Sequence, residues 1–231
     1  MSQLVFVPGL LCTNAIFSDQ FSAFEGLATC HTADTTNMTS VTQMAEKALD
    51  DISGNFALLG FSMGGYVALE ITRLAPERVT GLALVSTSSR PDTDEKRAAR
   101  QALIDLSKIG KFKGVTPRLL PRFFSKQALQ DEEKCNIVLK MGEEIGQQNF
   151  MSQQQAIMSR RDQRPHLPSI TQPSVVICGT EDVLTTPEES RESASLLPHS
   201  TLHLLEGIGH MSTLEAPEAV NQALLEWYKG L

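Results

Sequence analysis

Short apolar runs alternate with amphipathic stretches along the first 89 residues. Strand candidates lie at Leu4–Val7, Phe56–Leu59 and Val79–Val85, with a weaker one at Ala28–Thr35. Such short runs bounded by turn residues are typical of strands that are buried on both faces. Between them, apolar residues recur at helical spacing over 41–52, and a second helix is expected over 63–75, where Pro76 stops it. This β-α-β-α-β order predicts a parallel sheet with helices on its faces.

The pattern breaks over residues 90–171, which are charged, helix-prone and poor in β-branched runs. Strand-like runs return at Val175–Cys178 and Thr201–Leu205, and an amphipathic helix over 217–228 follows. We therefore predict an α/β fold with a doubly wound, mostly parallel sheet. Its core would be built from residues 1–89 and 172–231, and residues 90–171 would be inserted as a helical cap or lid.

Charge follows the same division. Of the 231 residues, 20 are Lys or Arg and 27 are Asp or Glu, for a net charge of −7. The 90–171 segment alone carries +5 and the rest of the chain −12. A basic lid on an acidic base explains this split, and attraction of an anionic substrate or of an acidic carrier protein is the alternative. No basic surface dominates, so we expect no nucleic-acid partner.

Nothing in the sequence predicts export or a membrane span. The first apolar run, Leu4–Val7, is not preceded by basic residues and ends at Pro8-Gly9. No run in the sequence approaches ~18 consecutive apolar residues. The four cysteines are widely spaced, without a C-x-x-C pair. We expect free thiols and a cytoplasmic protein.

The first candidate for chemistry is the motif Gly60-Phe61-Ser62-Met63-Gly64. It directly follows a predicted strand and directly precedes a predicted helix. That setting exposes a serine at the carboxyl edge of a sheet, and the helix N-terminus favours a developing oxyanion. Ser62 is therefore the predicted nucleophile.

This stretch, continued by Gly65, resembles the nucleophile elbow of the α/β-hydrolase fold, and the resemblance extends over nearly the whole chain. It implies a triad in the chain order serine, acid, histidine. It also implies that one oxyanion donor is the Met63 N–H and the other comes from the loop after the first strand. There Leu10 N–H is the candidate. Most relatives have His-Gly where this chain has Pro8-Gly9, a departure that leaves the glycine needed to turn the amide inward.

Five histidines compete for the role of base. His210, in Gly209-His210, follows the last predicted strand and precedes the last helix, and it also resembles the Gly-His segment of the family. The others lie within strands, at the opposite edge of the sheet or in the insertion; they are His31, His166, His199 and His203. His210 is the predicted base.

The orienting acid should leave the strand before the last one. Asp182, three residues after Gly179, fits the family pattern of Gly, two residues and Asp. Glu181 is expected at the surface. Asp92 and Asp94 remain rivals, because some relatives carry the acid one strand earlier.

The remaining site predictions concern the substrate pocket. Apolar residues in the insertion are expected to line it or to pack on the core, together with Cys12 from the first loop; the candidates are Cys12, Phe123, Phe124, Met141 and Phe150. Arg160, Arg161 and Arg164 are the candidates for anion binding. No metal site and no cofactor are expected, because no His/Cys/Asp cluster has ligand spacing.

The resemblance implies an enzyme. We expect a carboxylesterase that acts on a small or medium acyl ester through an acyl-enzyme. Carbon–carbon bond hydrolases of ring-cleavage products, thioesterases, perhydrolases, hydroxynitrile lyases and acyl-carrier methyl esterases share this constellation. A non-catalytic small-molecule receptor is the alternative from another class.

Overall fold

The computed structural model describes residues 2–109 and 111–231. Six strands form one parallel sheet in the order β2-β1-β3-β4-β5-β6. Their bounds are β1 Ser2–Val7, β2 Ala28–Thr32, β3 Phe56–Phe61, β4 Val79–Val85, β5 Ser174–Gly179 and β6 Ser200–Leu205. The sequence thus predicts the sheet correctly, with β2 shorter than expected. This edge strand ends where its partner β1 ends, just before Pro8, which has no N–H to offer a ladder.

The central strands bury both faces, and alternate residues serve different cores. In β1, Leu4 and Phe6 belong to one hydrophobic cluster, whereas Val5 and Val7 belong to the other. The first cluster contains residues of the 3₁₀ helix η1 (Asn14–Phe17) and of the last helix, α8 (Pro217–Tyr228). The second contains residues of the helices before and after β3, which are α2 (Val41–Asp51) and α3 (Met63–Leu74). This is why the strands read as continuous apolar runs.

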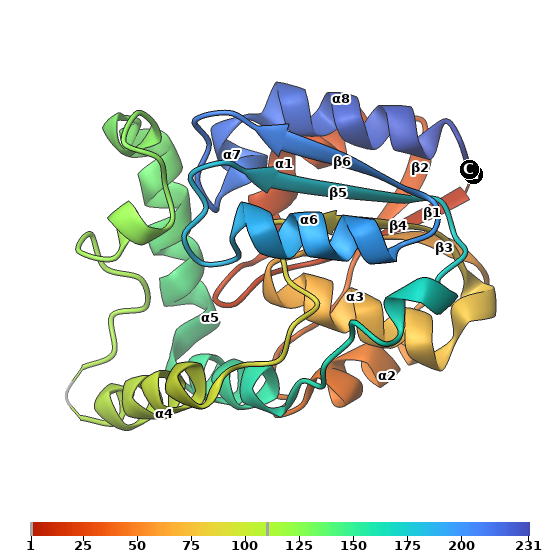
Figure 1. The fold of residues 1–231 in the computed structure, drawn as a ribbon. Coiled ribbons are helices and arrows are strands. Elements are labelled where there is room, and N and C mark those ends of the chain that lie inside the picture. The colour runs from red at the N-terminus through yellow and green to blue at the C-terminus, as the bar shows by residue number, and fades with distance from the viewer. Residues whose placement is uncertain (1, 110) are drawn as a thin grey trace.

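Helices cover both faces of the sheet (Figure 1). The α-helices are α1 Ser18–Ala23, α2 Val41–Asp51, α3 Met63–Leu74, α4 Asp94–Ser107, α5 Glu132–Ser159, α6 Pro187–Leu196, α7 Ser212–Glu215 and α8 Pro217–Tyr228. Short 3₁₀ helices are η1 Asn14–Phe17, η2 Pro76–Arg78, η3 Leu120–Arg122, η4 Ala128–Gln130 and η5 Leu167–Ser169. In the described part of the chain, no helix is long and apolar enough to cross a membrane.

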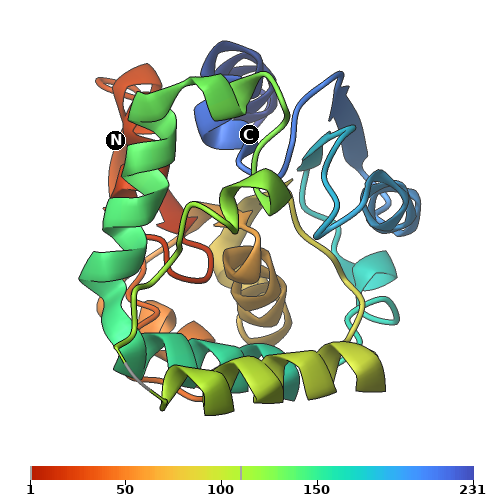
Figure 2. The ribbon, with the colours of Figure 1, turned by 90° about the vertical axis from the view of Figure 1, so that its left-hand side faces the viewer.

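The 90–171 segment forms α4, α5 and three of the 3₁₀ helices between β4 and β5. Those two strands are parallel neighbours with Val85 opposite Ile177, so the segment leaves the carboxyl end of β4 and returns to the amino end of the adjacent strand β5. It lies at the carboxyl ends of the strands (Figure 1), and Figure 2 shows α4 and α5 framing α3, which is seen nearly end-on. Within α5, Gly146 leaves the helical conformation at φ 77° and kinks the helix.

Candidate active site

Ser62 stands at the sharp turn between β3 and α3. Its backbone has φ 52° and ψ −116°, a region that L-residues rarely adopt. Hydrogen bonds at both sides hold the turn: Ser62 N–H donates to Val85 O at 3.0 Å, and Thr87 Oγ1 donates to Ser62 O at 2.7 Å. The side chain is half-buried at the N-terminus of α3.

Close backbone packing explains the glycines around this serine. A Cβ on Gly64 would lie 1.9 Å from Val7 O, and one on Gly60 would lie 2.5 Å from Gly64 O. Any side chain at either position would push α3 away from the sheet. The turn that exposes Ser62 therefore depends on these two residues.

His210 follows β6 and faces Ser62, as the sequence predicts. Its Nε2 lies 2.9 Å from Ser62 Oγ, and its Nδ1 lies 2.8 Å from Asp182 Oδ2. The three side chains form one hydrogen-bonded line in the order Ser62, His210 and Asp182, from the segments that follow β3, β6 and β5. The other histidines contact neither Ser62 nor Asp182 in the described structure; they are His31, His166, His199 and His203.

Asp182 is buried in the loop after β5. Its Oδ1 accepts the N–H groups of Leu184 and Thr185, and its Oδ2 also accepts the Thr185 hydroxyl at 2.9 Å. Burial alone would raise the pKa of this carboxyl, but the charge of His210 and these hydrogen bonds bring the pKa below its ordinary value. The lowered pKa favours a carboxylate anion at Asp182, which lies against Nδ1 of the imidazole.

The rival carboxylates lie elsewhere. Glu181 is exposed, as expected. Asp92 is buried but bonded to Arg100 and Arg160, and Asp94 is exposed at the start of α4. None of them contacts His210 in the part of the chain that the structure describes.

Two amides near Ser62 are available as donors. The N–H groups of Leu10 and Met63 have no protein acceptor within residues 2–109 and 111–231. Met63 is the first residue of α3, where the helix leaves its N–H groups unsatisfied. Gly9 beside Leu10 packs closely on Ser62, because a Cβ there would lie 3.3 Å from Ser62 Cβ.

The sequence did not predict what holds the loop that contains Leu10. Gln153 of α5 is fully buried, and its Oε1 accepts the Leu11 N–H at 3.0 Å. Its Nε2 donates to the carbonyl and hydroxyl of Thr35. A side chain of the 90–171 segment thus fixes the loop in which Pro8 replaces the usual histidine. A single glutamine in a charged helix carries no spacing signal, so the sequence could not have shown this.

A cavity of about 580 Å³ opens beside Ser62 and His210. Cys12, Phe123 and Phe150, three of the residues expected at the substrate pocket, line this cavity, along with apolar residues of α4 such as Leu103 and Leu106. Burial raises the pKa of the Cys12 thiol to about 12, so Cys12 is an uncharged part of the wall.

Phe124 and Met141 do not line the cavity. Both side chains are almost fully buried within the hydrophobic core, at 4% and 2% exposure. Phe124 follows Phe123 directly, and the backbone there turns through a 3₁₀ conformation that sends neighbouring side chains in different directions. The sequence shows that both residues here are apolar, but it does not show in which direction each side chain points.

The three arginines predicted to bind an anion also lie in different places, and only one of them lines the cavity. Arg160 is buried and lines the cavity, with its guanidinium 4.3 Å above the Tyr66 ring. Arg161 lies 3.6 Å from Glu70, and Arg164 is paired with Asp162; neither lines the cavity. Within residues 2–109 and 111–231, no group of three His, Cys, Asp or Glu side chains could hold a metal ion.

Relatives and solved structures agree with this architecture. A methyl ester esterase for pimeloyl-[acyl-carrier protein] from Photobacterium profundum is 27% identical over 212 residues, covering 82% of this chain and 77% of that protein. The 3-oxoadipate enol-lactonase 2 of Acinetobacter baylyi is 29% identical over 171 residues, covering 71% and 60%. A thermophilic esterase from Thermogutta terrifontis superposes with a TM-score of 0.91 at 22% identity, over 100% of this chain and 90% of that one.

The family model of the alpha/beta hydrolases matches residues 4–223, which is nearly the whole chain. That match spans Ser62, Asp182 and His210 together with the six-stranded sheet that positions them. The chain belongs to the alpha/beta hydrolase family.

Proposed function

We propose that this protein is a serine esterase that hydrolyses a carboxylic ester of a small or medium acyl group through an acyl-enzyme. The observation that carries the proposal is the line Ser62–His210–Asp182, with distances of 2.9 Å and 2.8 Å, at the wall of a largely apolar cavity. A serine hydroxyl becomes an effective nucleophile only with such a base and orienting acid.

The mechanism follows from these positions. Ser62 Oγ attacks the ester carbonyl while His210 Nε2 accepts its proton, and Asp182 stabilises the imidazolium through Nδ1. The Leu10 and Met63 amides donate to the oxyanion that forms. His210 then gives the proton to the departing alcohol oxygen, leaving an acyl group on Ser62. In the second half of the reaction, His210 deprotonates a water molecule that attacks the acyl carbonyl. The bond between the acyl group and Ser62 Oγ then breaks, His210 returns the proton to Ser62 Oγ, and the acid leaves.

The test is the Ser62→Ala variant assayed with a short-chain aryl ester. We expect loss of turnover by at least ~10³-fold with an unchanged thermal unfolding midpoint, because only the nucleophile is removed. Stoichiometric labelling of the wild-type serine by an organophosphate, followed by mass spectrometry, would identify the same residue. Full activity of Ser62→Ala would overturn the assignment, and binding without turnover in the wild type would indicate a receptor.

We also propose that the 90–171 segment acts as a lid over this site and that the protein works in the cytoplasm. Phe112, Val115 and Phe123 of the segment contribute to the cavity wall, which supports the first point. The four cysteines are all free, which is typical of a reducing compartment and supports the second.

A second candidate substrate is an ester carried on an acidic carrier protein. Lys111, Lys113 and Arg122 are exposed at the cavity, and within residues 2–109 and 111–231 they have no carboxylate partner. The name of the Photobacterium relative points in the same direction. Charge reversal of these three residues should lower kcat/KM for a carrier-linked ester about tenfold or more and leave that of a free ester nearly unchanged. Equal effects on both esters would rule out carrier recognition at this surface.

A further inference from the structure

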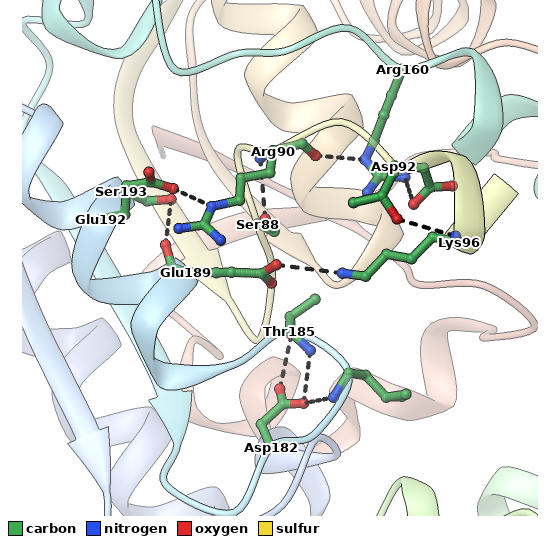
Figure 3. A network of polar contacts seen from close by, with 12 residues as sticks. Ser88, Arg90, Asp92, Lys96, Arg160, Asp182, Thr185, Glu189, Glu192 and Ser193 are labelled. Carbon is green, nitrogen blue, oxygen red and sulfur yellow. Dashed lines mark hydrogen bonds and ion pairs between the residues drawn. The ribbon is translucent and has the colours of Figure 1, made fainter.

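A buried polar cluster interrupts the apolar wall of the cavity. Tyr66 of α3, Arg100 of α4 and Arg160 at the end of α5 all line the cavity. Tyr66 and Arg160 are 6% and 7% exposed, so both are more than nine-tenths buried. Figure 3 shows Arg160 beside Asp92, at the edge of the network that also includes Lys96 and Glu189.

The charges in this cluster do not balance. The fully buried Asp92 carboxylate serves both guanidiniums, at 2.8 Å from Arg100 Nε and 2.7 Å from Arg160 Nη1. The other carboxylate on this wall, Glu189, lies 3.5 Å from Lys96. One positive charge is therefore left without a partner. The buried Arg160 shares the Asp92 carboxylate with Arg100, and a buried charge is costly unless an opposite charge accompanies it, so this wall favours the binding of an additional anion.

Hydrogen-bond donors remain available in the same place. Arg160 uses Nε and Nη1 for the carbonyls of Arg90 and Ile157, and Arg100 uses Nε and Nη1 for Asp92 and Gln154. Within the described residues, Nη2 of either arginine makes no protein hydrogen bond.

The third donor is the Tyr66 hydroxyl, which has no protein partner in the described part of the chain either. Burial raises the pKa of this phenol, although the neighbouring Arg160 and Arg100 lower it, so the hydroxyl stays protonated and can donate. These three donors belong to residues that line the same cavity, where the net charge is positive, and Arg160 lies directly against the Tyr66 ring.

We infer that Tyr66, Arg100 and Arg160 form a subsite for a carboxylate group of the substrate, so that the preferred esters carry a free acid close to the ester carbonyl. The planar guanidinium fork matches the geometry of a carboxylate. Tyr66 follows Ser62 by one turn of α3, about 6 Å along the helix axis. Because the subsite and Ser62 line the same cavity, the substrate we expect is a half-ester of a short dicarboxylic acid. The inference rests on the ester hydrolysis proposed above.

The experiment compares monomethyl glutarate, which carries the free acid, with dimethyl glutarate, which does not. We expect wild-type kcat/KM to be at least tenfold higher for the acid ester. Arg160→Gln should lower the ratio of the two kcat/KM values by about tenfold or more, chiefly through KM of the acid ester. Arg161→Gln is the matched control, because Arg161 is the next residue but lies outside the cavity.

Two further variants keep the inference testable if Arg160→Gln fails to fold. Arg100→Gln changes a residue that is partly exposed, and Tyr66→Phe removes only a hydroxyl; each should lower the same ratio. A wild type that hydrolyses both esters equally would overturn the inference while leaving the esterase proposal intact. So would variants that slow both esters in proportion. If the wild type hydrolyses neither of the glutarate esters nor the short-chain aryl ester, that result contradicts the esterase proposal itself.

Discussion

At the scale of single residues, the site combines positions that the sequence shows with contacts that it does not. The placement of His210 and Asp182 near Ser62 could be predicted, because all three follow parallel strands that end at the same edge of the sheet. Thr185, which donates to Asp182 and lies 3.3 Å from His210 Nδ1, could not, because polar side-chain contacts have no period or spacing. For the same reason, the sequence does not predict the Arg100–Asp92–Arg160 cluster.

Asp182→Asn should test the orienting role of the carboxylate. An amide that donates toward Nδ1 would impose the wrong imidazole tautomer, so we expect kcat to fall about 10³- to 10⁴-fold with KM little changed. Steady-state kinetics with an aryl ester measure this. Glu181→Gln, which removes the neighbouring exposed carboxylate, should behave as wild type. A loss in Asp182→Asn no larger than that of the control would show that another group orients His210.

At the scale of elements, the 90–171 segment is hydrogen-bonded to both loops that carry the proposed chemistry. Gln153 of α5 holds the Leu11 amide beside the proposed oxyanion donor. The carbonyl of Phe123 accepts the N–H groups of His210 and Met211. The sequence showed this segment as helical and charged, but contacts between distant segments depend on packing that no local pattern encodes. The proposed lid therefore also holds the loops that carry Leu10 and His210.

Gln153→Ala should therefore affect both stability and catalysis. It leaves the buried Leu11 N–H without an acceptor, which costs about 1–3 kcal/mol of unfolding free energy. It also frees the loop of Leu10, so we expect kcat to fall more than KM rises. Urea unfolding and aryl-ester kinetics measure the two effects, with Gln148→Ala on an exposed turn of the same helix as control. If Gln153→Ala is destabilised but keeps the wild-type kcat, Gln153 does not support the proposed oxyanion site.

At the scale of the whole molecule, basic residues of the 90–171 segment lie on acidic residues of the sheet-bearing part. Arg90 lies 2.6 Å from Glu192 and Lys96 3.5 Å from Glu189, as Figure 3 shows. Glu70 of α3 takes part too, accepting from Gln163 at 3.0 Å and lying 3.6 Å from Arg161. The sequence predicted this charge division. Much of the segment's positive charge is used inside the molecule, so it is not all available for ligands.

Glu70 should make the protein sensitive to acid. Burial alone would raise the pKa of this carboxyl, but its bonds with Arg73, Thr42 and Gln163 lower the pKa to about 2 from an ordinary value of 4.5. The ionised group therefore stabilises the fold above pH 4.5, and that stabilisation is lost as the pH falls toward 2. Glu70→Gln should lower the unfolding free energy by about 1–3 kcal/mol at pH 7 and by less at pH 3.

Urea unfolding at the two pH values measures the difference. The exposed Glu77→Gln serves as control. A deficit in Glu70→Gln that is equal at pH 7 and pH 3 would contradict the linkage.

The direct pairing of β4 with β5 across the 90–171 segment also determines the order in which the chain can fold. The strands β1 to β4 all lie within the first 89 residues, so they can pair with one another before residue 174 is synthesised. Until β5 pairs with it, the apolar strand β4 has unpaired backbone groups along one edge. Other chains can pair with such an edge and aggregate. Contacts this distant in sequence form slowly. A nascent chain released before residue 174 should therefore depend on chaperones, and esterase activity should be the last property to return on refolding.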